Sequence, residues 1–319
     1  MSYSSSRLGY LVKLIIILSL ICAFFTFAGF FTDHFSLFTH FICYSLIFST
    51  FTWIISLTPI IGRSSWRPRG WKLSTFFAVL AQAAIVLSTW FPVAEVQLES
   101  PQKLSVLWMN LSYQTKAAAE LELLAKQKNA DIVALAETYS QPLSNHFAAY
   151  PYSFKVAQSA LWIFSKYPIL NAKTHELIDD RSLLMADIAV NRRRVRIITG
   201  HLRWPIYDNH RTSLNTIAEL GSAFPNVIIA GDFNSSHWAS PFRNMLHESG
   251  LKHSRQGRGV FNSWHLDKEK LLGLPIDHIL YRGKINCTKF DLLKTQSSDH
   301  NAIYGEYLIG GKFVRKSRS

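Results

Sequence analysis

Three long apolar runs in the first third of the chain constrain its fold more than any other feature. They extend from Leu8 to Phe31, interrupted by Lys13, from Phe35 to Ile61, and from Leu73 to Val93. A helix needs about 20 apolar residues to cross the hydrocarbon core of a bilayer, and each run is long enough. Lys13 lies near one end of its run, where its long side chain reaches the headgroups at small cost. The sequence therefore predicts three membrane-spanning helices.

Two other interpretations of these runs are weaker. A cleaved signal peptide has a shorter apolar stretch and a small-x-small cleavage site, whereas the first run lacks such a site and two further runs follow it. Three helices buried in a soluble core would be expected to carry more polar faces. Residues 1–95 are therefore expected to form a membrane domain and to contact the lipid bilayer.

Positive charges beside the runs predict their orientation. Arg7 precedes the first run, no Lys or Arg separates the first from the second, and four cations separate the second from the third: Arg63, Arg67, Arg69 and Lys72. Because cytoplasmic loops carry an excess of Lys and Arg, the N-terminus and the second connection are expected in the cytoplasm. Three crossings then place everything after about Val93 on the non-cytoplasmic side of the membrane. If the organism is bacterial, this membrane is the inner membrane.

The net charge favours anionic partners. The 319 residues carry a formal net charge of +13, of which residues 1–98 contribute +4 and the rest +9, including a basic tail over residues 310–319. Such an excess fits phosphoesters, nucleic acid or anionic headgroups without distinguishing among them, and no protein partner is indicated. Three cysteines, Cys22, Cys43 and Cys287, are too few for a disulfide framework.

After Glu95 the pattern changes to short apolar runs that alternate with polar helical stretches, which suits one large α/β domain. Strands are expected at Leu104–Met109, Ile132–Leu135, Ala160–Phe164, Leu183–Val190, Arg194–Thr199, Val227–Ala230, Ile276–Tyr281 and Ala302–Leu308. Helices are expected at Gln114–Lys128, Asp208–Ala223 and Pro241–Ser249. Many strands with few helices, and a hairpin near Asn191–Arg193, favour two packed sheets flanked by helices over a simple parallel sheet.

Polar side chains occur repeatedly at the ends of these strands, where a sheet-based enzyme assembles its site. They are Asn110, Glu137, His201, Asp232, Asn234, Asp277, Asp299 and His300. Each one alone is more often a turn, cap or packing residue than a catalyst. Together, and without a Cys/His zinc spacing, these carboxylates, amides and histidines suit Mg²⁺ or Mn²⁺.

Six blocks in family order resemble the endonuclease/exonuclease/phosphatase superfamily, the fold of DNase I-like nucleases, exonuclease III-type abasic-site endonucleases, neutral sphingomyelinases and inositol polyphosphate 5-phosphatases. The blocks are Leu107–Asn110, Asp131–Glu137, Gly200–Leu202, Gly231–Asn234, Ile276–Leu280 and Ser298–His300. The resemblance covers residues 103–309 and implies a four-layer α/β/β/α sandwich. With the three preceding runs, the chain resembles a bacterial membrane-anchored subgroup.

The resemblance also implies a role for each matching residue. Glu137 would be the principal metal ligand, with Asn110 beside it and Asp299 near the metal or its waters. A bound metal neutralises phosphate charge and stabilises the leaving oxygen, while a carboxylate or histidine takes the proton of the attacking water. The remaining residues would be catalytic. Asp232 and Asn234 would position and activate the attacking water, and His300, oriented by Asp277, would hydrogen-bond the phosphate or act as the base. His201 matches the second histidine of the DNase I-like members.

Departures from the family pattern bear on the substrate. Ser112 stands where abasic-site enzymes carry a second polar residue, and it cannot serve as a carboxylate ligand. His265 replaces the proline that follows Trp264 in many members, and Trp264 is as compatible with the core as with the pocket. Further candidate substrate contacts are Arg203, Trp204 and Arg181.

The predicted topology narrows the function. A domain outside the cytoplasm is separated from the genome, which favours an envelope or lipid-linked phosphoester over DNA repair. The alternatives are a tethered nuclease acting on DNA or RNA, with strong salt dependence, and a non-catalytic binding module, which is disfavoured because every block retains catalytic-type residues. Arg192–Arg196 could form a nucleic-acid patch, but solvated charge at a hairpin tip is the favoured interpretation.

Overall fold

The computed structural model describes residues 2–58, 69–138, 143–156, 160–178, 180–266 and 270–310. The chain divides into two compact units, one of Met1–Phe91 with Trp238–Pro241 and the other of Pro92–His237 with Phe242–Ser319. Arg63, Arg67 and the basic tail beyond residue 310 lie outside the described residues. All three cysteines are free thiols.

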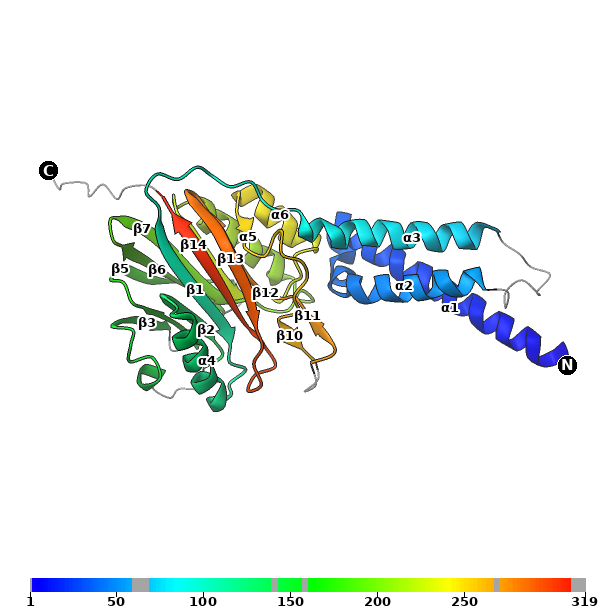
Figure 1. Ribbon diagram of the computed structural model, residues 1–319, viewed down its shortest axis with the longest axis horizontal. Coiled ribbons are helices and arrows are strands. Elements are labelled where there is room, and N and C mark those ends of the chain that lie inside the picture. Colours follow the sequence, from blue (N-terminus) through cyan, green and yellow to red (C-terminus); the bar gives the residue numbers. More distant parts are fainter. Residues whose placement is uncertain are drawn as a thin grey trace. The chain divides into compact units, whose positions relative to one another are not determined.

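Three apolar helices make up most of the first unit (Figure 1). They are α1 (Ser2–Phe31), α2 (Ile42–Leu57) and α3 (Arg69–Leu87), with the 3₁₀ helices η1 (Asp33–Phe41) and η3 (Ser88–Trp90). Within the described residues, three segments are long and apolar enough to cross a membrane: Gly9–Phe31, Asp33–Leu57 and Gly70–Trp90. The second includes η1, because the 16 residues of α2 alone rise only about 24 Å.

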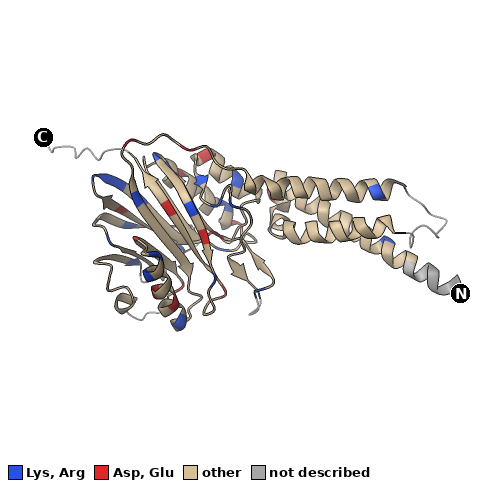
Figure 2. Cartoon of the chain, viewed as in Figure 1, with Lys and Arg blue, Asp and Glu red and all other residues tan. Residues whose placement is uncertain are grey.

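The three helices bury polar side chains and expose apolar ones, the reverse of a soluble bundle. Ser19 Oγ lies 2.9 Å from Thr52 Oγ1, and Gln82 Nε2 donates to Ser49 Oγ at 2.9 Å. The outward-facing side chains are mostly large and apolar, among them Leu14, Ile21, Phe24, Ile47, Phe51, Leu73 and Phe77. Lipid tails are as apolar as leucine, so helices in a bilayer associate through small and polar contacts of this kind. Figure 2 shows few charged residues on these helices, which suggest a membrane anchor.

Two six-stranded sheets form the second unit (Figure 1). Sheet A runs in the order β13-β14-β1-β2-β4-β3 and contains β1 (Gln102–Asn110), β2 (Ile132–Ala136), β3 (Tyr152–Val156), β4 (Leu161–Ser165), β13 (Ile285–Leu293) and β14 (Ala302–Ile309). Sheet B runs in the order β5-β6-β7-β8-β12-β9 and contains β5 (Ile169–Glu176), β6 (Ser182–Val190), β7 (Arg193–His201), β8 (Val227–Asp232), β9 (Lys252–His253) and β12 (Asp277–Arg282). A separate hairpin pairs β10 (Trp264–His265) with β11 (Gly273–Leu274).

Alternating side chains divide each sheet between two layers of apolar packing. Val106 and Trp108 of β1 pack between the sheets against residues such as Ile197 and Ile228 of sheet B. Leu107, one position along, packs outward with helix α4 (Thr115–Lys128). Helix α5 (Asn209–Ser222) covers the outer face of sheet B, and α6 (Ser240–Ser249) follows β8. The expected four-layer α/β/β/α sandwich is confirmed.

The connections explain why a simple parallel sheet is excluded. Among the strands of the described residues, only β1/β2 and β7/β8 are parallel pairs, and α4 and α5 connect their strands. The neighbouring pairs on either side are antiparallel, and the expected hairpin turns at Asn191 between β6 and β7. The sequence did not predict β3, β5, β9, β10, β11 or β13, three of which are two-residue strands.

Candidate active site

Strand ends bring the eight sequence-predicted residues to one edge of the sandwich. Asn110, His201 and Asp232 are the last residues of β1, β7 and β8, and Glu137 directly follows β2. Asp277 begins β12, and Asp299 and His300 precede β14, so these three lie at the starts of strands. Because β12 is antiparallel to β8, and β14 to β1, these strands begin where their neighbours end.

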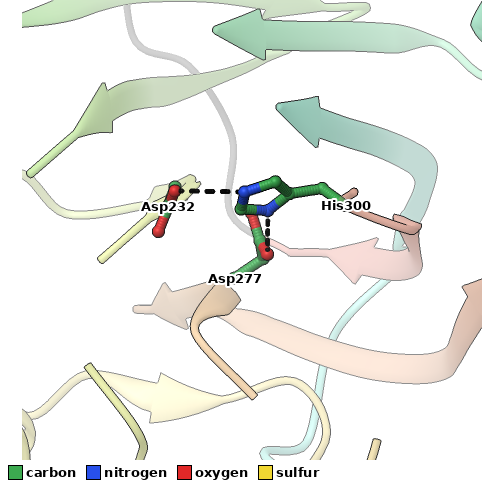
Figure 3. Close-up of side chains that lie close together, drawn as sticks. All are labelled: Asp232, Asp277 and His300. Atoms are coloured by element: carbon green, nitrogen blue, oxygen red, sulfur yellow. Dashed lines mark hydrogen bonds and ion pairs between the residues drawn. The ribbon is translucent and has the colours of Figure 1, made fainter. Parts of the chain in front are cut away.

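His300 lies between two buried carboxylates (Figure 3). Its Nδ1 atom is 2.8 Å from Asp277 Oδ2, and its Nε2 atom is 3.8 Å from Asp232 Oδ2. The other oxygen of Asp277 accepts a hydrogen bond from Trp108 Nε1 at 2.9 Å. Both oxygens of Asp277 are therefore engaged, which fixes the orientation of the imidazole and directs Nε2 toward Asp232.

The charges of this group determine its protonation. Burial by itself lowers the pKa of His300, but the charge and hydrogen bond of Asp277, together with the charges of Asp232 and Asp299, outweigh it and raise the pKa to about 9. Burial favours protonation of Asp277, yet the contact with His300 keeps its pKa below the ordinary value. The pKa of Asp232 is raised, by burial first and then by the charge of Asp277. At neutral pH the arrangement is thus an imidazolium beside an ionised Asp277, with Asp232 the carboxylate that protonates more readily.

Asp232 and Asn234 form a compact turn with His201. The backbone N–H of Asn234 donates to Asp232 Oδ1 at 2.8 Å, and Asn110 Nδ2 donates to Asp232 Oδ2 at 3.2 Å. Asn234 has φ +49°, a left-handed conformation that asparagine tolerates better than most residues. Its Nδ2 atom donates to Leu202 O at 2.8 Å and lies 3.2 Å from His201 Nε2. Burial, with the charge of Arg181 next, lowers the pKa of His201 to about 3 and keeps it neutral.

Glu137 is held in an unfavourable conformation and environment. Its φ is +52°, a region that costs a non-glycine residue free energy. Burial raises its pKa, and the charge of Asp299 raises it further against the opposing effects of His300 and a hydrogen bond from Asn110. A cation at this position would relieve the repulsion between the two carboxylates. The oxygens of Glu137, Asp299 and Asn110 fit a hard divalent ion.

A second group of atoms is also close enough to hold a metal. Ligand atoms of Asp232, Asp277 and His300 lie within 4.8 Å of one another. Asp277, however, already uses one oxygen for Trp108 and the other for His300. This hydrogen bonding identifies the three residues as a carboxylate–histidine pair with a neighbouring carboxylate.

Three of the four candidate substrate contacts adjoin these residues. Arg181 Nη1 lies 3.0 Å from His201 Nδ1. Trp264 Nε1 donates to Asp299 Oδ2 at 3.0 Å, and the rings of Trp264 and Trp204 meet edge to face with centroids 5.9 Å apart. Trp264 is partly exposed and contacts Asp299, so it lies outside the core. The guanidinium of Arg203 lies over the Tyr207 ring at 5.6 Å.

Several positioning residues were not predicted. Ser298 Oγ accepts from His300 N at 3.0 Å and donates to Asn110 O at 2.9 Å. Ser263 Oγ accepts from Asp277 N at 2.9 Å. Trp108 could have been found, since it lies two residues before Asn110 and so on the same face of β1. Ser112 contributes its backbone N–H to Asn110 Oδ1 at 2.9 Å.

A buried chain of histidines supports the Asn234 turn. The N–H of Arg255 donates to His253 Nδ1 at 3.1 Å, His253 Nε2 lies 2.8 Å from His278 Nδ1, and His278 Nε2 lies 2.7 Å from Ser235 O. Because His253 Nδ1 accepts a hydrogen bond, the ring proton of His253 lies on Nε2 and is donated to His278 Nδ1. His278 therefore also carries its proton on Nε2, which donates to Ser235 O. Burial lowers the pKa of His253 well below its ordinary value.

The arginines of the β6–β7 hairpin serve the fold. Arg196 Nε donates to Asp187 Oδ1 at 2.7 Å, and Arg194 pairs with the same carboxylate. The guanidinium of Arg196 also lies 4.1 Å from the centre of the Phe224 ring, and Arg193 donates to Ser100 O. These internal contacts leave little of the predicted segment for a nucleic-acid patch.

The model of the Endonuclease/Exonuclease/phosphatase family matches residues 107–300 of the chain, more than half of its length. The protein belongs to the endonuclease/exonuclease/phosphatase family. The matched region begins in β1 and ends at His300, so it includes every sequence-predicted site residue. A search of the curated proteins found no match.

Solved structures share the fold of this family member. Humanized TDP2 of D. rerio has a TM-score of 0.55 and 19% identity, covering 64% of this chain and 98% of its own. Mannosyl-6-phosphatase of Bacteroides thetaiotaomicron has a TM-score of 0.52 and sphingomyelinase C of Streptomyces griseocarneus one of 0.50, each with 14% identity over 64% of this chain and 99% of its own. At these identities the similarity establishes the fold alone.

Proposed function

We propose that the protein is a membrane-anchored, divalent-metal-dependent hydrolase that cleaves an envelope or lipid-linked phosphoester on the non-cytoplasmic side. The observation that carries this proposal is His300 between Asp277 and Asp232, next to the oxygen ligands Glu137 and Asn110. That arrangement supports the proposal because it brings together a charged hydrogen-bond donor, a carboxylate with a raised pKa and oxygen atoms of the kind that bind a divalent metal.

Each residue then has a chemical task. Glu137, Asn110 and Asp299 would hold Mg²⁺ or Mn²⁺, which when bound neutralises phosphate charge. The raised pKa of Asp232 suits it to accept a proton from the attacking water, and Asn234 fixes the position of Asp232 through its backbone N–H. The pKa of about 9 favours His300 as a donor from Nε2 to a phosphate oxygen over His300 as a base. Asp277 holds the imidazole in place.

The preference for a lipid-linked substrate is based on the N-terminal helices. Their length, apolar surface and flanking cations support an anchor with the catalytic domain outside the cytoplasm. A nuclease is the second candidate, because residues 99–319 carry a net charge of +9 and TDP2 of D. rerio, which shares the fold, was crystallised with a single-stranded DNA product. Such an activity would fall steeply with salt.

A substrate panel tests the proposal. Detergent-purified full-length protein would be incubated with plasmid DNA, single-stranded RNA, a phospholipid and a lipid-linked pyrophosphate, with Mg²⁺, Mn²⁺ or EDTA. Turnover of a lipid, abolished by EDTA and by Glu137→Gln, is the expected result. Nicking of plasmid with the lipids untouched would replace the proposal with the nuclease. If no substrate turns over in the wild type while Mn²⁺ binds, the binding-module interpretation gains.

A further inference from the structure

Large apolar side chains are exposed on two loops beside the site. Trp204, Ile206 and Tyr207 follow β7, and Leu266, Leu271 and Leu272 lie in the β10–β11 hairpin. Their exposed fractions range from 45% to 79%. Soluble surfaces carry single exposed apolar residues routinely, whereas a group of aromatic and aliphatic side chains in one place marks an interaction surface. We call these six residues the apolar rim.

Contacts join the two loops and connect them to the active site. The Trp204 and Trp264 rings meet at 5.9 Å, and Trp264 Nε1 donates to Asp299. Leu266 N donates to Leu272 O at 2.9 Å within the hairpin. His265 N, also in the hairpin, donates to Asp299 O of the candidate site at 3.0 Å. Figure 1 shows the hairpin beside the edge where β1 ends. The rim therefore lies beside the candidate active site.

We propose that the apolar rim inserts into the interfacial layer of the bilayer and so brings the site to phosphoesters at the membrane surface. This deepens the proposed function and rests on it. Aromatic and aliphatic side chains with cations nearby are the composition of surfaces that lie in a membrane interface. Arg203 adjoins Tyr207, so a positive charge accompanies the rim where anionic headgroups would lie.

The short connection between the third candidate span and β1 favours a bilayer over a protein or nucleic acid as the partner of the rim. The third candidate span ends at Trp90 and β1 begins at Gln102, and this connection extends at most about 40 Å. A bilayer that holds the spans is always within that reach of the sheet unit. Nucleic acid would be contacted by cations rather than by three leucines and an isoleucine.

Site-specific labelling tests insertion without relying on catalysis. Full-length protein with Cys22, Cys43 and Cys287 replaced by alanine would receive Leu272→Cys, carry an environment-sensitive fluorophore there, and be reconstituted in vesicles of phosphatidylethanolamine and phosphatidylglycerol. The matched control is Leu123→Cys, since Leu123 is 59% exposed on α4, against the outer face of sheet A. We expect lipids carrying a shallow nitroxide to quench the label at 272 and leave that at 123 bright. Equal quenching at both positions would overturn the proposal.

Kinetics supply a second readout. Ile206→Ser, Leu271→Ser and Leu272→Ser combined should raise KM for a lipid phosphoester in vesicles roughly tenfold or more, because apolar area no longer leaves water on binding. Hydrolysis of a short, soluble phosphoester should keep its wild-type kcat, as should both activities in Leu123→Ser. An equal loss on both substrates would contradict the rim as a membrane contact. If the wild type hydrolyses nothing, the proposed function fails and the quenching comparison alone decides the rim.

Discussion

At the scale of single residues, the metal role proposed for Glu137 opposes stability. Burial and repulsion by Asp299 disfavour the ionised side chain, and the left-handed backbone adds conformational strain. Glu137→Gln should therefore raise the unfolding temperature in EDTA by about 2–4 °C, the shift that about 1 kcal/mol produces in a domain of this size. The same variant should lose the stabilisation that Mn²⁺ gives the wild type, because a ligand stabilises only the state that binds it.

Thermal unfolding of the detergent-solubilised chain, followed by intrinsic fluorescence with Mn²⁺ or EDTA, checks both effects. Glu219→Gln is the matched control, since Glu219 is exposed on α5 and should change neither value. A Glu137→Gln variant that Mn²⁺ still stabilises as strongly as the wild type would remove Glu137 from the metal position.

The residues that the sequence located are those tied to strand ends. An apolar run that stops at a carboxylate or amide marks Asn110, Glu137 and Asp232 without knowledge of the pairing. The hydrogen bond from Trp108 to Asp277 joins positions 169 apart on opposite sheets, and no local pattern encodes it. The role of Trp264 stayed open for the same reason, because its partners Trp204 and Asp299 come from distant segments.

At the scale of elements, burial decided which strands the sequence could predict. β2 and β6 are almost wholly buried, and both are mainly apolar, with Asp187 interrupting the apolar residues from Leu183 to Val190 in β6. β5 and β13 lie at sheet edges, and β5 is mostly exposed, so its residues carry little apolar signal. In β13 a bulge between Cys287 and Lys289 also shifts the alternation, which breaks the period of two.

The close approach of β7 and β8 gives a prediction at this scale. Gly231 pairs with Gly200, and a Cβ on Gly231 would lie 2.6 Å from Gly200 O. Gly231→Ala must push these strands apart beside Asp232, which we expect to cost about 1–3 kcal/mol. Thermal unfolding measures the cost, with Gly70→Ala as control because a Cβ there meets no atom within 4 Å. An unchanged unfolding temperature for Gly231→Ala would show that β8 accommodates the methyl group.

The β6–β7 hairpin should depend on pH through Asp187. Burial alone would raise the pKa of Asp187, but hydrogen bonds from Arg196 and Arg194 outweigh it and lower the pKa. Its contribution to stability is then complete above the unfolded pKa of about 3.9 and is lost as the pH falls through the lower folded value. Asp187→Asn should destabilise the protein by about 1.5–3 kcal/mol at pH 7, and the difference should shrink below about pH 4.

Unfolding temperatures of wild type and Asp187→Asn between pH 3 and pH 7 test this expectation. Asp208→Asn serves as control, because Asp208 is exposed and makes no side-chain cap hydrogen bond at α5. A wild-type advantage that stays constant down to pH 3 would mean that packing, and not the charge of Asp187, stabilises the hairpin.

At the scale of the whole molecule, the sequence predicted a division into helices and sandwich because the two parts obey opposite rules. In the sandwich apolar side chains alternate inward, whereas in α2 the buried side chains include Ser45, Ser49, Thr52 and Ser56. Hydropathy length alone reveals such spans. Orientation is a different property, set by charges in the connections rather than by packing.

The orientation is therefore the prediction to test at this scale. The N-terminus and the second connection are expected in the cytoplasm. A fluorescent reporter that matures only in the cytoplasm should therefore stay dark when it is fused after Ser319 in a bacterial host. A phosphatase reporter that is active only outside the cytoplasm should be active at the same position. The same reporters inserted at Ser65, between the second and third apolar runs, should give the reverse. Replacing Arg63, Arg67, Arg69 and Lys72 with neutral residues should weaken this preference, because these cations carry the asymmetry. Bright fluorescence at Ser319 of the unaltered chain would place the site in the cytoplasm, where DNA and RNA are within reach, and the nuclease would become the better proposal.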